Sequence, residues 1–307
     1  GSYDTAVAAL LVERPEVPTK DLYEALAIEE IRSAAEILNP VWSESAGEDG
    51  YVSLEVSPHL AHDTDGSVAE ARRLWAAVER PNLMIKVPAT EAGIPAIERL
   101  IADGINVNAT LMCSLADDEA VAQAYVRGIG SCERPDQVAS VASFFVSRVD
   151  TMVDAALDAI GSDQALALRG KAAVANAKLA YRRFEEIFRG GSFAAELARG
   201  ARVQRPLWAS TSSKNPAYSD VLYVEELIGP DTVNTLPVVT LEAFKDHGRP
   251  RTSITEGVGA AEETIAALAG LGVDMGAVTR ELQEQGVAAF AKSFDELLAA
   301  LDTKRSE

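Results

Sequence analysis

The stretch NLMIKVPATEAG, residues 82–93, carries a lysine in the middle of an aliphatic run. Side chains of a β-strand alternate between its two faces. The aliphatic side chains of this run therefore share one face, where we expect them to pack against covering helices: Leu83, Ile85 and Val87. Lys86 then points to the opposite face, into the interior of the fold. An amine in that place is either half of a structural ion pair or a reactive group held away from water.

Runs rich in β-forming residues alternate with helical stretches along most of the chain. Six such runs are recognisable, at residues 51–56, 82–87, 105–113, 140–149, 206–211 and 232–238. The helical spacing of apolar residues between them predicts crossover helices, and therefore a parallel sheet of right-handed βαβ units. Two further helices, separated by Pro15 and Pro18, are predicted before the first strand.

Two architectures fit this alternation, an open doubly wound sheet and a closed (β/α)8 barrel. No predicted strand leads into a G-x-G-x-x-G turn or a P-loop, which weakens the nucleotide-binding version of the open sheet. Polar residues inside the strands or at their carboxyl ends favour the barrel, because barrel enzymes place their chemistry there. These residues are Glu55, Lys86, Asn106, Asn108, Thr110, Ser143 and Ser210. We therefore predict an α/β protein of the (β/α)8, or TIM barrel, class with six recognisable strands.

The same alternation turns polar side chains of three successive strands toward one interior: Glu55, Lys86, Asn108 and Thr110. A buried charge is costly unless it is paired, so one interpretation is a structural ion pair between Lys86 and Glu55. The other is an amine catalyst, because removal from water lowers the pKa of an amine and the free amine attacks carbonyl carbon. Glu55 would then shuttle protons, while Asn108 and Thr110 orient substrate hydroxyls and a water. The convergence of Ser143 on this interior favours the reactive site.

The overall charge argues against nucleic acid as a partner. The formal net charge is -19, from 47 acidic and 28 basic residues, so the average surface repels phosphate backbones. We also expect no membrane partner and no signal peptide, since no apolar run approaches the length of a membrane span. Cys113 and Cys132 form no disulfide framework, which is typical of a cytoplasmic protein. His59 and His62 form an H-x-x-H pair without a third ligand at a suitable spacing, so no metal is predicted.

Three long segments resemble the transaldolase family in its longer bacterial form: RPNLMIKVPATEAGIPAIERLIADGINVNATLMCSL (80–115), VASFFVSRVDTMVD (141–154) and LWASTSSKNPAYSDVLYVEELIGPDTVNTLP (207–237). The similarity extends over nearly the whole chain. It implies a (β/α)8 barrel enzyme, a transferase that moves a three-carbon dihydroxyacetone unit between sugar phosphates in the pentose phosphate pathway. The reaction implied converts sedoheptulose 7-phosphate and glyceraldehyde 3-phosphate to erythrose 4-phosphate and fructose 6-phosphate. It proceeds through a Schiff base without a cofactor.

The resemblance also implies roles for single residues. The Schiff-base lysine of the family falls on Lys86, and the carboxylate of its proton relay on Glu55. The residues that hold the catalytic water and the bound intermediate fall on Asn108 and Thr110, and a substrate-contacting serine falls on Ser143.

A phosphate site is implied by three further positions. The arginine that grips phosphate falls on Arg148, and a phosphate-site serine on Ser210. Shorter transaldolases have an arginine shortly after that serine, where this chain reads TSSK at 211–214. Lys214 is expected to take that role across a small insertion. Arginine offers phosphate a planar fork and lysine a point charge, so the two together would form the local positive site that an acidic protein needs.

The same resemblance leaves two strands of the family's barrel without a counterpart in this chain. The first carries an aspartate that takes a proton during carbon–carbon cleavage, and the second carries an asparagine in a T-x-N-P context. Asp4 lies in a helical stretch and is a poor substitute for that aspartate. We expect either that the native protein has a further N-terminal segment, which we favour, or that another polypeptide covers the gap.

One domain is expected over residues 1–307, with a helical segment at 1–48 before the first strand, in a cytoplasmic monomer or homodimer. Two alternative functions stay open. One is a Schiff-base aldolase that releases its three-carbon product. The other is a catalytically impaired protein that binds sugar phosphates.

Overall fold

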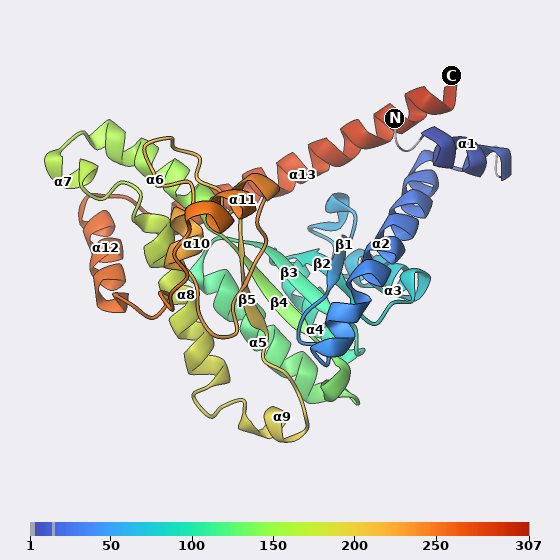
Figure 1. Cartoon of the computed structure of the whole chain (residues 1–307), viewed down its shortest axis with the longest axis horizontal. Coiled ribbons are helices and arrows are strands. Elements are labelled where there is room, and N and C mark those ends of the chain that lie inside the picture. Colours follow the sequence, from blue (N-terminus) through green and yellow to red (C-terminus); the bar gives the residue numbers. More distant parts are fainter. Residues whose placement is uncertain (1–3, 14–15, 307) are drawn as a thin grey trace.

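The computed structural model describes residues 4–13 and 16–306 of the chain (Figure 1). Its strands form one parallel sheet in sequence order: β1 (Val52–Glu55), β2 (Leu83–Pro88), β3 (Val107–Met112), β4 (Ser140–Phe145), β5 (Arg205–Ala209) and β6 (Val233–Asn234). Each strand overlaps one of the six runs predicted from the sequence, although β6 is much shorter than its run.

Helices precede the sheet, connect its strands and follow it. They are α1 (Asp4–Glu13), α2 (Thr19–Glu44), α3 (Thr64–Val78), α4 (Gly93–Ala102), α5 (Leu115–Ser131), α6 (Ser147–Ile160), α7 (Asp163–Leu166), α8 (Ala172–Phe188), α9 (Ala194–Ala198), α10 (Leu222–Glu226), α11 (Val238–His247), α12 (Val258–Gly270) and α13 (Met275–Ser306), with the 3-10 turns η1 (Pro58–Leu60) and η2 (Pro135–Gln137). The helices α1 and α2 are the two that the sequence predicted before the first strand. Because proline cannot donate a backbone hydrogen bond, Pro18 suits the position just before α2.

The sheet curls into a half-barrel whose outer face is covered by helices (Figure 1). Leu83, Ile85 and Val87 lie completely buried in the main core, as the alternation of the lysine strand predicted. Within the described residues, β1 and β6 pair on one side only and form the two edges of the sheet. Six parallel strands with helical crossovers confirm the α/β class and agree with the (β/α)8 architecture.

A bulge interrupts β3 near its carboxyl end. The register with β4 shifts between Ala109 and Met112, and Leu111 has a φ of 61°, a conformation that is strained for a branched residue. The side chain of Leu111 lies against α13, where a Cβ added to Gly286 would stand 3.0 Å from it. Strict alternation of side chains therefore ends at this point of the strand.

The last helix, α13, is 32 residues long and crosses the carboxyl ends of the first three strands (Figure 1). Its Gln283 donates hydrogen bonds to the backbone carbonyls of Ala89, just after β2, and Leu111, in β3. Farther along, Asp295 pairs with His59 of η1 at 2.7 Å. The helix thus lies over the end of the sheet where the candidate site residues gather.

Candidate active site

The centre of the site is an ion pair between neighbouring strands. Glu55 is the last residue of β1 and stands beside Lys86 of β2 in the strand ladder. The Nζ atom of Lys86 lies 3.0 Å from Oε2 of Glu55, and each side chain is 23% exposed. The amine is therefore largely shielded from bulk solvent but still partly exposed, as a group that must meet a substrate has to be.

A row of polar side chains continues from this pair across the inner face of the sheet. Asn108 of β3 is the ladder neighbour of Lys86. Its Nδ2 donates to Oγ of Ser53 in β1 at 3.0 Å, and its Oδ1 accepts from Oγ of Ser143 in β4 at 2.7 Å. The amide of Asn108 is thus fixed in orientation by partners on both sides, which suits a residue that positions a ligand.

Thr110 differs from its polar neighbours because its hydroxyl has no partner. The residue is completely buried next to the bulge of β3, and its Oγ1 has no hydrogen-bond partner among the described residues. An unpaired buried hydroxyl costs about 1–3 kcal/mol. Such a group in a polar interior is a place where a ligand atom or a water completes the bonding.

A second cluster forms where β4 and β5 end. Ser147 begins α6, and its Oγ lies 2.9 Å from Oγ of Ser210, the residue that follows β5. Ser210 reaches this position through a φ of 56°, which turns the chain sharply after the strand. Arg148 places its guanidinium 5.4 Å from the ring centre of Phe145. Among the described residues no carboxylate forms an ion pair with Arg148, so its charge is free to bind an anion.

Lys214 lies in the loop between β5 and α10 and is exposed. Its Nζ donates to Oγ of Ser212 at 2.6 Å rather than to Ser210. The structure thus brings Arg148 and Ser210 to the same end of the sheet through Ser147, and leaves Lys214 at its margin.

Two tyrosines hold this loop and the start of α10 against α6. The hydroxyl of Tyr218 donates to Asp154 at 2.5 Å, and that of Tyr223 donates to Asp150 at 2.8 Å. Asp150 also accepts from the amide of Ala173. Burial raises the pKa of Asp150 to about 6, and burial together with the bond to Asp154 raises the pKa of Tyr218 to about 12.

One polar residue predicted near the site lies elsewhere. Asn106 precedes β3, and its amide bonds the carbonyls of Pro81 and Leu83 and the amide of Ala139. It therefore ties together the amino ends of the strands, opposite the Lys86 site. The alternation of side chains shows which face of the sheet a residue occupies, but it does not show at which end of a short strand the residue lies.

Phe290 of α13 is a site neighbour that the sequence analysis missed. The Nζ atom of Lys86 lies 5.3 Å from the centre of its ring. A signal for this contact exists in the sequence, since Gln283, Gly286, Phe290 and Phe294 recur at intervals of three or four and share one helical face. That pattern predicts a packed face but not the surface on which it packs.

Within residues 4–13 and 16–306, no group of three or more His, Cys, Asp or Glu side chains is placed to hold a metal ion. In the same part of the chain, no helix combines the length and apolarity that crossing a bilayer requires.

A parallel α/β half-barrel with a lysine–carboxylate pair at the carboxyl ends of its strands has the layout of the barrel enzymes that use amine chemistry. Residues 1–301 match the model of the transaldolase/fructose-6-phosphate aldolase family. The chain belongs to this family, and the resemblance seen in the sequence is confirmed.

Individual relatives agree with the family model. The transaldolase of Thiobacillus denitrificans is 53% identical over 294 residues, which cover 94% of this chain and 82% of the relative. That of Mycolicibacterium smegmatis is 49% identical, with 97% of this chain and 81% of the relative covered. That of a Parafrankia species is 50% identical, with 95% and 79% covered.

Proposed function

We propose that this enzyme of the transaldolase family acts as a transaldolase. It transfers a dihydroxyacetone unit from sedoheptulose 7-phosphate to glyceraldehyde 3-phosphate, which gives erythrose 4-phosphate and fructose 6-phosphate, in the pentose phosphate pathway. The observation that carries the proposal is the 3.0 Å contact between Nζ of Lys86 and Oε2 of Glu55, inside the curl of the sheet.

In the first step the free amine of Lys86 attacks the ketose carbonyl carbon and forms a carbinolamine. Glu55, which took the extra proton of the lysine ammonium and so freed its amine, gives that proton to the departing hydroxyl, so that water leaves and an iminium remains. The observed separation of the two groups is within the reach needed for such proton transfer, directly or through one water. The carboxylate regains its proton when water later releases the product.

In the second step the iminium takes up the electron pair of the breaking carbon–carbon bond and becomes an enamine. The hydroxyl on the departing carbon gives its proton to a base, a role that the resemblance assigns to an aspartate, and the aldose fragment leaves as an aldehyde. The enamine then attacks the aldehyde carbon of the acceptor, whose oxygen takes that proton back. Asn108 and Ser143, already bonded to each other, orient the substrate hydroxyls. The unpaired hydroxyl of Thr110 binds the water or the intermediate.

Substrate phosphate binds beside this centre. Arg148 supplies the planar fork and Ser210 a hydroxyl, with Ser147 as its neighbour. Lys214 adds a point charge from the loop margin. The unpaired guanidinium supports this role, because a protein of net charge -19 must attract its anionic substrate locally.

Covalent trapping tests the proposal directly. Incubation with fructose 6-phosphate followed by borohydride reduction should add mass to the peptide that contains Lys86, and Lys86→Arg should abolish the adduct. Lys178 is a matched control, because it is also shielded and also lies near a glutamate, Glu226, at 3.3 Å. Lys178→Arg should keep the adduct. Labelling at another lysine, or none at all, would contradict the proposal.

A second candidate is a Schiff-base aldolase that releases its three-carbon product, since the family description names fructose-6-phosphate aldolase beside transaldolase. Addition of erythrose 4-phosphate separates the two, because only the transferase forms sedoheptulose 7-phosphate. A third candidate, an impaired sugar-phosphate-binding form, predicts saturable binding without a trapped adduct.

We further infer that residues 1–307 form one domain, with a helical segment at 1–48, in a cytoplasmic monomer or homodimer that does not bind nucleic acid. No metal or organic cofactor is needed, since the iminium is itself the electron sink. Activity should therefore be unchanged after treatment with EDTA.

A further inference from the structure

The ring of Phe290 lies against the amine of Lys86, from an element at the far end of the chain. The distance from Nζ to the ring centre is 5.3 Å, close enough for the face of the ring to attract a cation. An ammonium and an iminium are both cations, so this contact is available to the free lysine and to the covalent intermediate. Phe290 is half-buried between the helix and the site.

The helix that carries Phe290 is anchored close to the catalytic strands. Gln283, seven residues earlier, donates to the carbonyls of Ala89 at 3.0 Å and Leu111 at 3.2 Å. Gly286 allows close approach, because a Cβ there would stand only 3.0 Å from Cδ2 of Leu111. These contacts fix the height of α13 above β2 and β3 and hence the position of the ring over Lys86.

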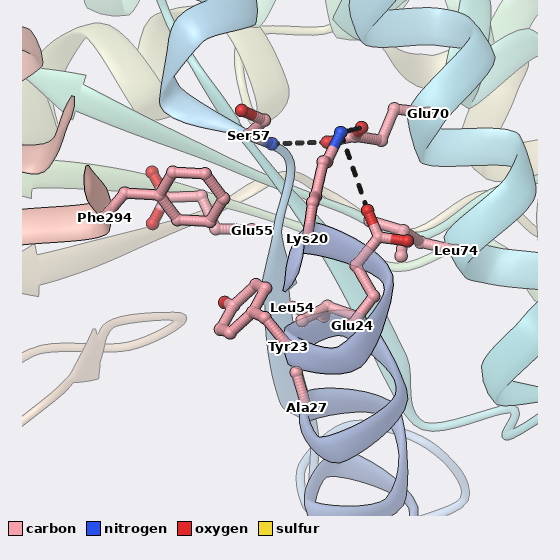
Figure 2. A pocket seen from close by; sticks show the side chains of 10 residues that line it. All are labelled: Lys20, Tyr23, Glu24, Ala27, Leu54, Glu55, Ser57, Glu70, Leu74 and Phe294. Carbon is pink, nitrogen blue, oxygen red and sulfur yellow. Dashed lines mark hydrogen bonds and ion pairs between the residues drawn. The ribbon is translucent and has the colours of Figure 1, made fainter. Parts of the chain in front are cut away.

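A second ring of the same helix lies beside the other half of the ion pair. Phe294 and Tyr23 of α2 meet edge to face, with ring centres 5.3 Å apart. Together with Glu55 they line a cavity of about 20 Å³, the size of one water. Figure 2 shows Glu55 on the side of Phe294, away from the cluster in which Lys20 bonds Glu70. Of the two rings, only that of Phe290 contacts the amine of Lys86, whereas that of Phe294 packs on Tyr23 and His59 beside Glu55.

An aromatic ring over the amine affects which reaction the enamine undergoes next. Early loss of the three-carbon unit requires a proton on the enamine carbon and then water on the iminium carbon. The sum is enamine plus water giving dihydroxyacetone plus the free lysine amine. Transfer instead requires the enamine to survive until an aldehyde arrives. An apolar ring over the nitrogen removes the solvent that early release consumes.

Building on the function proposed above, we propose that Phe290 is a specificity-determining residue: it keeps solvent from the Lys86-bound intermediate and so favours transfer to an aldose phosphate over release of dihydroxyacetone.

The test measures how the intermediate divides between its two products. Each variant receives fructose 6-phosphate and erythrose 4-phosphate, and free dihydroxyacetone and sedoheptulose 7-phosphate are quantified in the same reaction. Phe290→Ala should raise the ratio of the first product to the second by about tenfold, the order of discrimination that one apolar contact provides. Phe290→Leu, which keeps an apolar cover, should stay within about twofold of the unsubstituted protein.

Phe294→Ala is the matched control, because it removes the same ring one turn farther along the same helix. It should loosen the docking of α13 on Tyr23 and His59 but leave the product ratio within about twofold.

The other outcomes contradict the proposal. A slower Phe290→Ala variant with an unchanged product ratio would show that the ring affects only rate or folding. An equal rise of the product ratio in Phe290→Ala and Phe294→Ala would show that the effect comes from the docking of α13 and not from the ring of Phe290. If Phe290→Ala does not fold, Phe290→Gln and Phe294→Gln replace the two alanine variants: an increased ratio in Phe290→Gln alone supports the proposal, and equal ratios in the two refute it. Absence of a trapped adduct in the unsubstituted protein would instead refute the Schiff-base function itself.

Discussion

Two buried threonines near the ends of adjacent strands differ in what their hydroxyls contact. Oγ1 of Thr110 has no partner among the described residues, whereas Oγ1 of Thr90 donates to the carbonyl of Ala61 and accepts from the amide of Gly93. Thr110→Val should therefore leave the free energy of unfolding unchanged or raise it, and yet lower kcat. Thr90→Val should lower the free energy of unfolding by about 1–3 kcal/mol, because it leaves the carbonyl of Ala61 and the amide of Gly93 without this hydrogen-bond partner.

Urea denaturation and steady-state kinetics on both threonine variants check this pair of predictions. A Thr110→Val variant with full activity would remove the proposed role of its hydroxyl in binding water or the intermediate. A loss of stability like that of Thr90→Val would show that the hydroxyl has a structural partner.

The carboxylate of Glu55 is proposed to move protons, so its removal should act on rate rather than on binding. Glu55→Gln keeps the size of the side chain and its contact with Lys86 but cannot shuttle protons. We expect kcat to fall by about 10²–10⁴-fold, while KM changes little. Glu70→Gln is the control, since Glu70 lines the same cavity but bonds Lys20 and the amide of Ser57. Equal rates in the two variants would contradict the relay.

At the scale of the single residue, strand alternation was enough to bring Lys86, Glu55, Asn108 and Ser143 together. It used only the period of two and the parallel order of the strands. It could not show that the hydroxyl of Thr110 is unpaired, because that depends on every atom around it. Nor could it place Ser210, whose φ of 56° ends the alternation of β5.

At the scale of the element, the loop after β5 is held by a contact remote from substrate. The hydroxyl of Tyr218 bonds Asp154 of α6, the helix that also carries Ser147 and Arg148. Tyr218→Phe removes this bond and should let the loop with Ser210 move relative to α6. We expect KM for fructose 6-phosphate to rise by about fivefold, because a less well positioned phosphate site weakens the free energy of substrate binding by about 1 kcal/mol.

A phosphate-free substrate gives the control for this variant. Trapping of dihydroxyacetone on Lys86 does not use the phosphate site, so its rate should be the same in Tyr218→Phe and in the unsubstituted protein. Parallel losses with both substrates would mean that Tyr218 supports the fold rather than the phosphate site.

The bounds of the helices and strands could be predicted from the sequence to different degrees. Long runs with a clear period, such as β2 and the two N-terminal helices, were predicted close to their observed bounds. The strand β6 was predicted over seven residues but has two, because its edge position leaves it a single pairing partner among the described residues. The path of α13 over the site was not predictable, since its packed face matches several apolar surfaces equally well.

At the scale of the whole molecule, burial of a carboxyl couples stability to pH. Asp150 is almost completely buried, with hydrogen bonds from the amide of Ala173 and the hydroxyl of Tyr223. Burial raises its pKa from 3.8 to about 6. Between these two values the folded state binds more protons than the unfolded state. This group therefore lowers the free energy of unfolding as pH rises from about 4 to about 6, and has no further effect above that.

A neutral replacement should remove this dependence. In Asp150→Asn the new side-chain amide can still accept a hydrogen bond from the backbone amide of Ala173 and donate one to the hydroxyl oxygen of Tyr223. The difference in free energy of unfolding, Asp150→Asn minus the unsubstituted protein, should therefore grow in favour of the variant from pH 4 to pH 6, by up to about 3 kcal/mol, and then level off. Urea denaturation at each pH measures it, with exposed Asp65→Asn as the control that should show no such growth. A difference that is flat, or that shrinks with rising pH, would show that the carboxylate is stabilised in the fold and that its pKa is not raised.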